Sequence, residues 1–151
     1  MCIRDRSTAL EIWSQTGGQI DYLVCALGTS GTIMGLSRFL KALKPEIKVV
    51  CAHPIRGHYI QGLKNMEEAI VPAIYDPSRI DIQEMVESEE AIAMARRIIA
   101  EEGIFAGMSS GAAMLAASRI AASIPSGNIV VVFPDRAEKY LSTPMFADFN
   151  K

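Results

Sequence analysis

The order of apolar and polar residues predicts strands and helices that alternate along the chain. Four apolar runs, bounded by glycine, proline or polar residues, predict strands at residues 20–27, 47–52, 80–86 and 128–133. Between the first two runs, apolar residues spaced three and four apart form the stripe of a helix, namely Ile33, Leu36, Phe39, Leu40 and Leu43. A strand, a helix and a second strand in succession imply a parallel pair with a right-handed crossover.

Three further helices are predicted from their ends. One spans residues 8–15 and is closed by Gly17-Gly18. The second is expected to be capped by Ser88, with acidic residues in its first turn, and to end at Gly103. The third is rich in alanine, comes after a cluster of glycines and serines at residues 106–111, and runs to about Ser123. The chain therefore predicts an α/β fold: a mainly parallel, twisted sheet with helices on both faces.

Composition favours one globular domain. The chain has 151 residues, of which 50% are hydrophobic and 21% charged, which suffices for a sizeable core. Residues 1–7 crowd charges around one isoleucine and differ abruptly in composition from residues 8–15. We expect them to be a non-native or disordered tail, and residues 8–151 to form the domain.

Charge and cysteine content exclude several classes of function. A net charge of −2, without clusters of lysine and arginine between aromatic residues, gives no surface for nucleic acid. Apolar runs are too short to cross a bilayer, so no membrane contact is expected. Cys2, Cys25 and Cys51 form no CxxC motif and the last two lie in apolar runs, which indicates buried thiols, no metal site and no disulfide. A reducing cytoplasm fits this pattern best.

The stretch Gly28-Thr29-Ser30-Gly31-Thr32 stands between a predicted strand and a predicted helix. Such a junction leaves backbone N–H groups unpaired at the positive end of the helix dipole, where they can bind a phosphate. Glycines let the backbone approach the anion, and the hydroxyl groups can add donors. The alternative is a tight turn that binds nothing.

Other segments are expected to meet this loop. Gly28, Pro54 and Pro134 each come directly after a predicted strand, and ligands of open α/β sheets bind at the carboxyl ends of the strands. The irregular segment 56–76 is too long for a simple connector, and long loops often line sites. By contrast, we expect Asp135 and Arg136 to be a solvated or salt-bridged pair.

Four motifs in the same order resemble the C-terminal half of cysteine synthases. They are GTSGTIMG after IDYLV, GHYIQGLKN, EEGIFAGMSSGAA and VVFPDRAEKYLST. Cysteine synthases are pyridoxal-phosphate enzymes of the tryptophan synthase β type, also called fold-type II. The resemblance covers nearly all of this chain from Thr8, but about half of a family member, and is greatest for the cysteine synthase B branch. It implies most of the larger, cofactor-phosphate-binding domain.

The resemblance implies roles for particular residues. Gly28, Thr29, Ser30, Gly31 and Thr32 match the loop that binds the 5'-phosphate of pyridoxal 5'-phosphate. The position of Ser30 is usually glycine or threonine in the family.

Beyond this loop, Ser109 matches the serine that hydrogen-bonds the pyridine nitrogen. Gln61 and Gly62 match a loop at the substrate entrance. The parent reaction would replace the leaving group of an activated serine, an O-acetyl or O-phospho ester, by sulfide to give L-cysteine. A homodimer is implied for the full-length protein.

The resemblance also shows departures and an absence. His53 stands where relatives often have glutamate or glutamine, and Ala137 where glycine is usual. The lysine that forms a Schiff base with the cofactor belongs to the family's N-terminal half, and neither Lys64 nor Lys139 lies in its sequence context. We therefore expect no catalytic residue in this chain, and no activity from the chain alone.

Three other interpretations stay open at this point. Cystathionine β-synthase and other β-eliminating relatives differ in the N-terminal half. A nucleotide-binding or regulatory module could use the same glycine loop, although it would need an acidic residue where the second strand ends at His53-Pro54. A truncated, non-functional product would expose apolar surface and aggregate.

Overall fold

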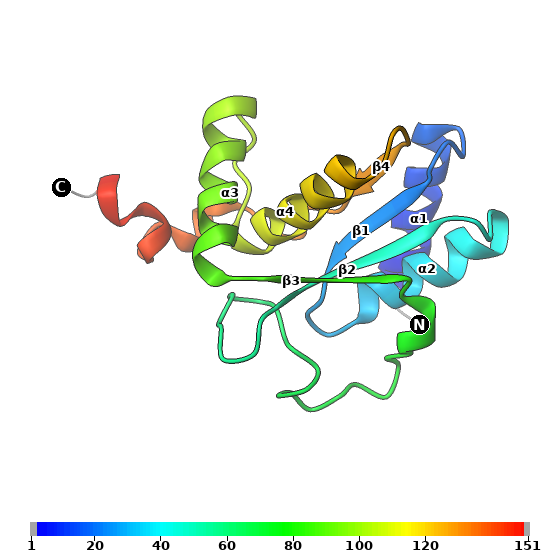
Figure 1. Cartoon of the computed structure of the whole chain (residues 1–151), viewed down its shortest axis with the longest axis horizontal. Helices are drawn as coiled ribbons and strands as arrows, with labels where there is room; N and C mark the ends of the chain where they lie inside the picture. Colours follow the sequence, from blue (N-terminus) through cyan, green and yellow to red (C-terminus); the bar gives the residue numbers. More distant parts are fainter. Residues whose placement is uncertain (1–2, 150–151) are drawn as a thin grey trace.

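A four-stranded parallel sheet forms the centre of the molecule (Figure 1). The computed structural model describes residues 3–149. The strand order is β3-β2-β1-β4, and all neighbouring strands are parallel. The strands are β1 (Tyr22–Ala26), β2 (Lys48–Pro54), β3 (Ile82–Val86) and β4 (Ile129–Val131). The predicted α/β class with a parallel sheet is confirmed.

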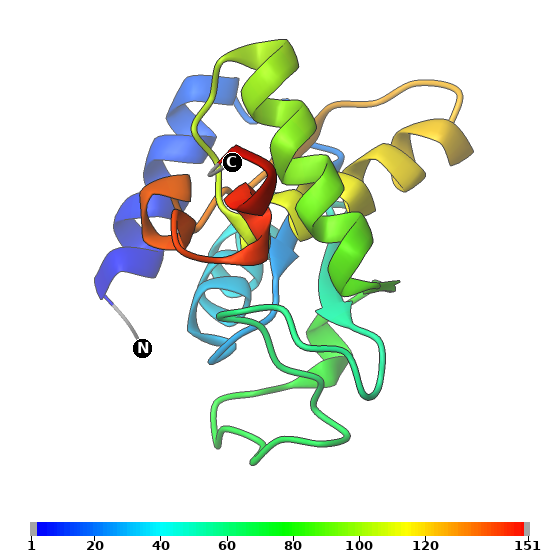
Figure 2. The same ribbon diagram turned by 90° about the vertical axis from the view of Figure 1, so that its left-hand side faces the viewer.

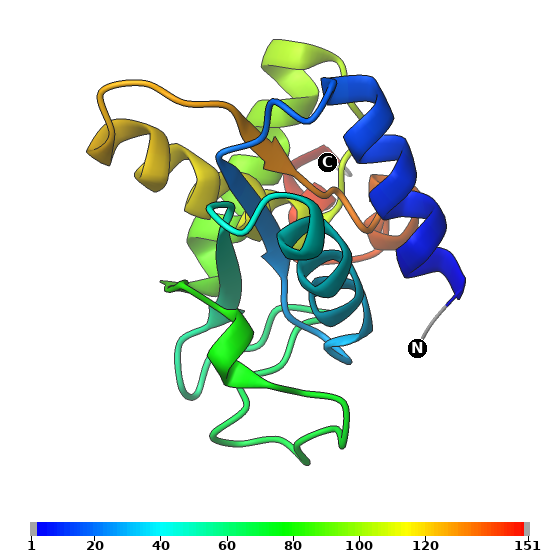
Figure 3. The ribbon, with the colours of Figure 1, turned by 90° about the vertical axis from the view of Figure 1, so that its right-hand side faces the viewer.

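Helices cover both faces of this sheet. One face carries α1 and α2, and the opposite face carries α4, with α3 packed against α4 (Figures 2 and 3). The helices are α1 (Ile3–Thr16), α2 (Gly31–Leu43), α3 (Ser88–Glu102) and α4 (Met108–Ser123). The short 3-10 helices are η1 (Pro77–Arg79), η2 (Ala137–Tyr140) and η3 (Pro144–Phe149).

The two central strands are mostly apolar because both of their faces are buried, and the polar residues of β2, Lys48 and His53, lie near its two ends. Leu23 and Cys25 pack in the core beneath α1 and α2, whereas Val24 packs in the core beneath α4. In the paired register, Cys25 lies opposite Cys51 and Val24 opposite Val50. Side chains alternate between the faces of a strand, so a strand covered on both sides needs apolar residues at every position.

Two predicted helix starts differ from the structure. The helix predicted from Thr8 begins at Ile3, because a formed helix extends cheaply into neighbouring residues. Part of the expected tail is therefore helical, and residues 1–2 lie outside the described residues. The prediction that Ser88 caps α3 is wrong: Glu87 is the N-cap, and the Ser88 hydroxyl donates to the carbonyl oxygen of Tyr59 at 2.9 Å.

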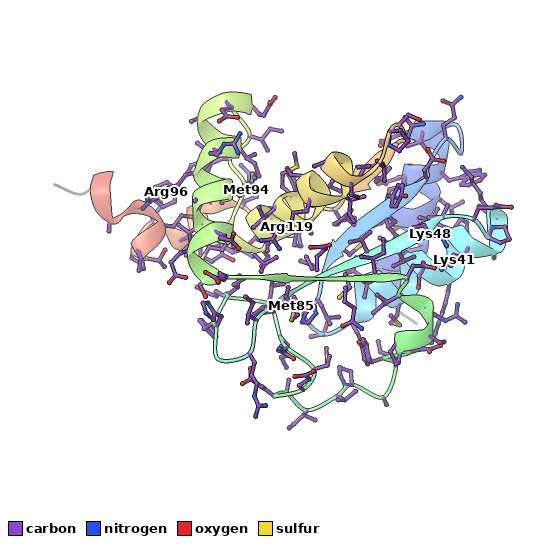
Figure 4. The ribbon with its side chains drawn as sticks, in the orientation of Figure 1. Lys41, Lys48, Met85, Met94, Arg96 and Arg119 are labelled. Atoms are coloured by element: carbon purple, nitrogen blue, oxygen red, sulfur yellow. The ribbon has the colours of Figure 1, made fainter. Side chains whose placement is uncertain are left out.

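Charged side chains tie the helices to β3 at the outside of the sheet (Figure 4). Lys41 of α2 pairs with Asp81 at 2.6 Å. Arg119 of α4 donates to the carbonyl oxygen of Met85 at 2.7 Å and pairs with Glu90 at 2.9 Å. Lys41 and Arg119 therefore stabilise the packing of α2 and α4 at the β3 edge of the sheet.

Gly111 allows α4 to approach α3 closely. A Cβ atom built at Gly111 would overlap the carbonyl oxygen of Ala91 and lie 2.9 Å from the Cβ of Ala95. Real Cβ atoms do not come so close to backbone, so only glycine fits here. This contact fixes the first turns of α4 against α3.

Gly111→Ala is expected to destabilise the chain by about 1–3 kcal/mol, because overpacking outweighs the better helix propensity of alanine. Urea unfolding followed by circular dichroism measures this. Gly31→Ala is the matched control, since the nearest atom outside its immediate neighbours is 3.9 Å away, and it should cost nothing. A Gly111→Ala chain as stable as the wild type would contradict the packing.

Candidate functional site

Loops after β1, β2 and β4 meet at the carboxyl end of the sheet, around a cavity of about 300 Å³. The loop after β1 contributes residues 28–32, and the long loop after β2 contributes Gly62 and Leu63. Ser109 of α4 and Asp135 after β4 complete the lining together with Tyr140. The expected convergence of these loops is confirmed.

Gly28 is required for the cavity's shape. A Cβ atom there would lie 2.5 Å from the carbonyl oxygen of Gly62. The two loops are also joined by a hydrogen bond from the backbone N–H of Lys64 to the carbonyl oxygen of Leu27 at 2.8 Å. Close backbone contact between the loops therefore depends on glycine at position 28.

The N-terminus of α2 opens into this cavity. Ser30 is its N-cap, yet makes no side-chain capping hydrogen bond, and the first turn carries no acidic residue. Ser30 has a φ of 64°, a left-handed conformation that is rare outside glycine. Its hydroxyl is buried without a hydrogen-bond partner. A buried orphan hydroxyl costs about 1–3 kcal/mol, which indicates that a bound group completes this site.

Thr29 and Thr32 are exposed beside Ser30, as donors to a ligand at this helix end would need to be. Helix N-termini leave their first backbone N–H groups without intrahelical partners. The predicted loop thus combines free donors with the positive end of the α2 dipole. Its chemistry suits an anion.

Ser109 faces the same cavity from the first turn of α4. Its hydroxyl is buried and donates to the carbonyl oxygen of Gln61 at 2.9 Å. Gly62 lines the cavity, whereas the Gln61 residue is exposed and reaches Ser109 through its main chain. The structure brings Ser109 and Gly62 to the same cavity as residues 28–32. The substrate roles of Gln61 and Gly62 stay predictions.

The prediction for this pair is wrong for Asp135, whereas Arg136 is exposed and salt-bridged, as predicted. Asp135 binds the N-terminus of α4: its carboxylate accepts from the backbone N–H of Ser109 at 3.0 Å and of Ser110 at 2.9 Å. Arg136 pairs instead with Glu138 at 2.6 Å. The free N–H groups of a helix start attract a carboxylate more strongly than an exposed arginine does.

Tyr140 is a further residue that sequence reasoning missed. Its hydroxyl donates to Asp135 at 2.6 Å, and burial together with this carboxylate raises the pKa of the phenol. Lys139 also lines the cavity. Tyr140 and Lys139 lie in the VVFPDRAEKYLST motif. Their place in the site depends on Asp135, whose partner Ser110 is 25 residues away in the sequence, and no local pattern shows this pairing.

The two departures from the family pattern, His53 and Ala137, have different surroundings in the structure. His53 is buried at the end of β2, its ring nitrogens have no hydrogen-bond partner, and burial lowers its pKa. Ala137 is fully buried and starts η2 with a hydrogen bond from its N–H to the carbonyl oxygen of Phe105 at 3.0 Å. Its φ is not positive, so glycine is not needed there.

Cys25 and Cys51 are buried free thiols, as predicted, and burial raises the pKa of both. Cys2 lies outside the described residues. Among residues 3–149, no group of three or more histidine, cysteine or acidic side chains could hold a metal ion. The helices of this part of the chain are also too short or too polar to span a bilayer.

Many phosphate-binding proteins place a helix N-terminus at the carboxyl end of an open parallel α/β sheet, and this chain has the same arrangement. Residues 3–135 match the family described as pyridoxal-phosphate dependent enzyme. The chain belongs to this family, whose cofactor is pyridoxal 5'-phosphate.

Cysteine synthases are among the curated relatives of the chain. The chain is 44% identical to cysteine synthase of Aquifex aeolicus, over 94% of this chain and 45% of the relative. It is 41% identical to cysteine synthase B of Pseudomonas aeruginosa, over 93% of this chain and 47% of the relative. The chain thus spans about half the length of these relatives.

A solved structure shows the same fold. O-acetyl serine sulfhydrylase isoform 3 from Entamoeba histolytica superimposes with a TM-score of 0.85 and 36% identity, covering 92% of this chain and 44% of that protein. These likenesses support the cysteine synthase resemblance. They do not favour cystathionine β-synthase or a module without catalysis.

Ser30→Ala is expected to raise the free energy of unfolding by about 1 kcal/mol in phosphate-free buffer, because it removes an orphan buried hydroxyl. Urea unfolding measures the change. Ser37→Ala is the control: this buried hydroxyl of α2 donates to the carbonyl oxygen of Met34 at 3.1 Å, so its removal should bring no gain. A clear loss of stability in Ser30→Ala would show that the hydroxyl has a partner.

Proposed function

We propose that the chain is the cofactor-phosphate-binding part of a pyridoxal-phosphate-dependent cysteine synthase. One observation carries this proposal: the orphan hydroxyl of Ser30 lies at an uncapped helix N-terminus that faces a cavity. Ser109 lines the same cavity from another helix. A ligand with a phosphate at one end and a ring nitrogen at the other fits these donors.

Backbone N–H groups of residues 28–32 would hold the 5'-phosphate. The positive end of α2 stabilises the anion, and the hydroxyls of Thr29, Ser30 and Thr32 add donors. Gly28 keeps the backbone accessible and lets the Gly62 loop close beside it. A bound phosphate would thereby give the hydroxyl of Ser30 a hydrogen-bond partner.

Ser109 would donate a hydrogen bond to the pyridine nitrogen. Its hydroxyl now donates to Gln61, and rotation about one side-chain bond redirects the proton. A neutral hydroxyl, unlike a carboxylate, does not hold the ring nitrogen protonated, which suits β-elimination and replacement. Bound pyridoxal phosphate supplies an electron sink for the substrate's α-carbon.

The reaction of the whole protein would be β-replacement, in which sulfide displaces acetate or phosphate from an O-acetyl or O-phospho serine to give L-cysteine. Gln61 and Gly62 would border the substrate, and the Schiff-base lysine would come from the half of the family that this chain does not match. We propose a cytoplasmic homodimer for the full-length protein. The family resemblance supports this proposal.

Pyridoxal 5'-phosphate should bind the chain at least about tenfold more tightly than pyridoxal, because charge-assisted hydrogen bonds to the phosphate contribute more than about 1.4 kcal/mol. Isothermal titration calorimetry measures both affinities. Gly28→Ala should weaken binding of the phosphate by about tenfold or more, since its Cβ displaces the Gly62 loop.

Ser30→Ala provides a milder change at the same loop, because it leaves the backbone donors in place. Gly17→Ala is the remote control: its φ of 58° strains an added side chain, but nothing lies within 4 Å of the added atom, so the cavity stays unchanged. Equal affinity of the wild type for pyridoxal and its phosphate would refute the phosphate site.

The chain alone, given pyridoxal 5'-phosphate, O-acetylserine and sulfide, should form no cysteine above the rate without protein. Borohydride reduction and subsequent peptide mass spectrometry should find no single modified lysine. Lys139 is the lysine to examine first, because it lines the cavity and would be within reach of a bound aldehyde. Cysteine formation, or a specific adduct at one lysine, would contradict the proposal that the chain lacks the catalytic group.

A further inference from the structure

Two helices, α2 and α4, direct their N-termini at one cavity, and their ends differ. The end of α2 has no side-chain cap and no acidic residue in its first turn, and the hydroxyl of Ser30 beside it is buried without a partner. At the N-terminus of α4, the carboxylate of Asp135 accepts hydrogen bonds from the N–H groups of Ser109 and Ser110. Of these two helix ends, α2 is therefore the one open to an anion from outside.

Four hydrogen bonds hold the carboxylate of Asp135 at the N-terminus of α4. Besides the two backbone donors, the hydroxyls of Ser110 and Tyr140 each donate to its carboxylate at 2.6 Å. A Cβ atom at Gly107 would lie 2.5 Å from one carboxylate oxygen and equally near the Tyr140 ring. Glycine at this N-cap thus leaves room for the carboxylate.

We propose that Asp135 is a specificity-determining residue, whose carboxylate fills the anion position of α4 so that a ligand's phosphate binds only at α2. This inference rests on the proposed function for the identity of the ligand. A negative charge beside Ser109 repels a second anion, and it uses the N–H groups that such an anion would need. The ligand's other end must then be uncharged or a hydrogen-bond acceptor.

Asp135 also positions Ser109. Its bond to the Ser109 N–H fixes the main chain from which the hydroxyl projects, next to the carbonyl oxygen of Gln61. The Ser109 hydroxyl is thereby presented to the cavity from a turn that cannot shift without breaking hydrogen bonds to this carboxylate. Asp135 thus sets both the charge and the geometry around Ser109, where the ring nitrogen of the proposed ligand would bind.

The test is a titration of the ¹⁵N-labelled chain with inorganic phosphate, monitored residue by residue through backbone amide chemical shifts. In the wild type, amides of residues 28–32 should shift, and those of Ser109 and Ser110 should not. In Asp135→Ser, the amides of Ser109 and Ser110 should shift as well, because the vacated helix end accepts phosphate.

Glu138→Gln is the matched control. It removes the same charge from an exposed side chain that pairs with Arg136, and it should reproduce the wild-type pattern. Asp135→Asn, which keeps one side-chain oxygen as an acceptor, is the second variant. A dispersed amide spectrum checks that each variant is folded.

Phosphate shifts at Ser109 and Ser110 in the wild type would overturn the inference, even if both variants failed to fold. Unshifted Ser109 and Ser110 amides in folded Asp135→Ser would also overturn it. Unshifted amides at residues 28–32 in the wild type would refute the proposed function instead. The two failures are thus seen at different residues.

Discussion

Free backbone N–H groups at the start of α2 are the feature on which the rest of the site depends. They lie at the carboxyl end of β1, where a parallel sheet gathers the loops of several strands. Ser30 takes a left-handed conformation there and buries its hydroxyl without a partner. The fold bears this cost at the cavity itself, which is typical of strain kept at a functional site.

The neighbouring helix start has the opposite electrostatic character. Asp135 caps α4 and neutralises its positive end, whereas α2 stays uncapped. The cavity consequently has one end that attracts an anion and one end that presents a hydroxyl next to a carboxylate. We infer from this asymmetry that a ligand binds with its anionic end toward α2.

The geometry of the site and the family membership of the chain support different parts of the proposed function. The glycine loop and the α2 N-terminus indicate a phosphate of any kind. Family membership identifies the cofactor as pyridoxal 5'-phosphate, and the cysteine synthase relatives suggest the substrates. The chain spans about half the length of those relatives, and the proposed chemistry also draws on the half that this chain does not match.

The sequence by itself determined the elements and the glycine loop at residues 28–32, because both follow from local patterns. Apolar runs predicted every strand within a few residues, and Gly28 with its neighbours marked the strand-to-helix junction. Only the tertiary structure decided the role of Asp135, which sequence reasoning placed in solvent or in a pair with Arg136. A carboxylate's partners are set by which helix end the fold brings within hydrogen-bond distance, and residues 25 apart show no sign of this in their spacing.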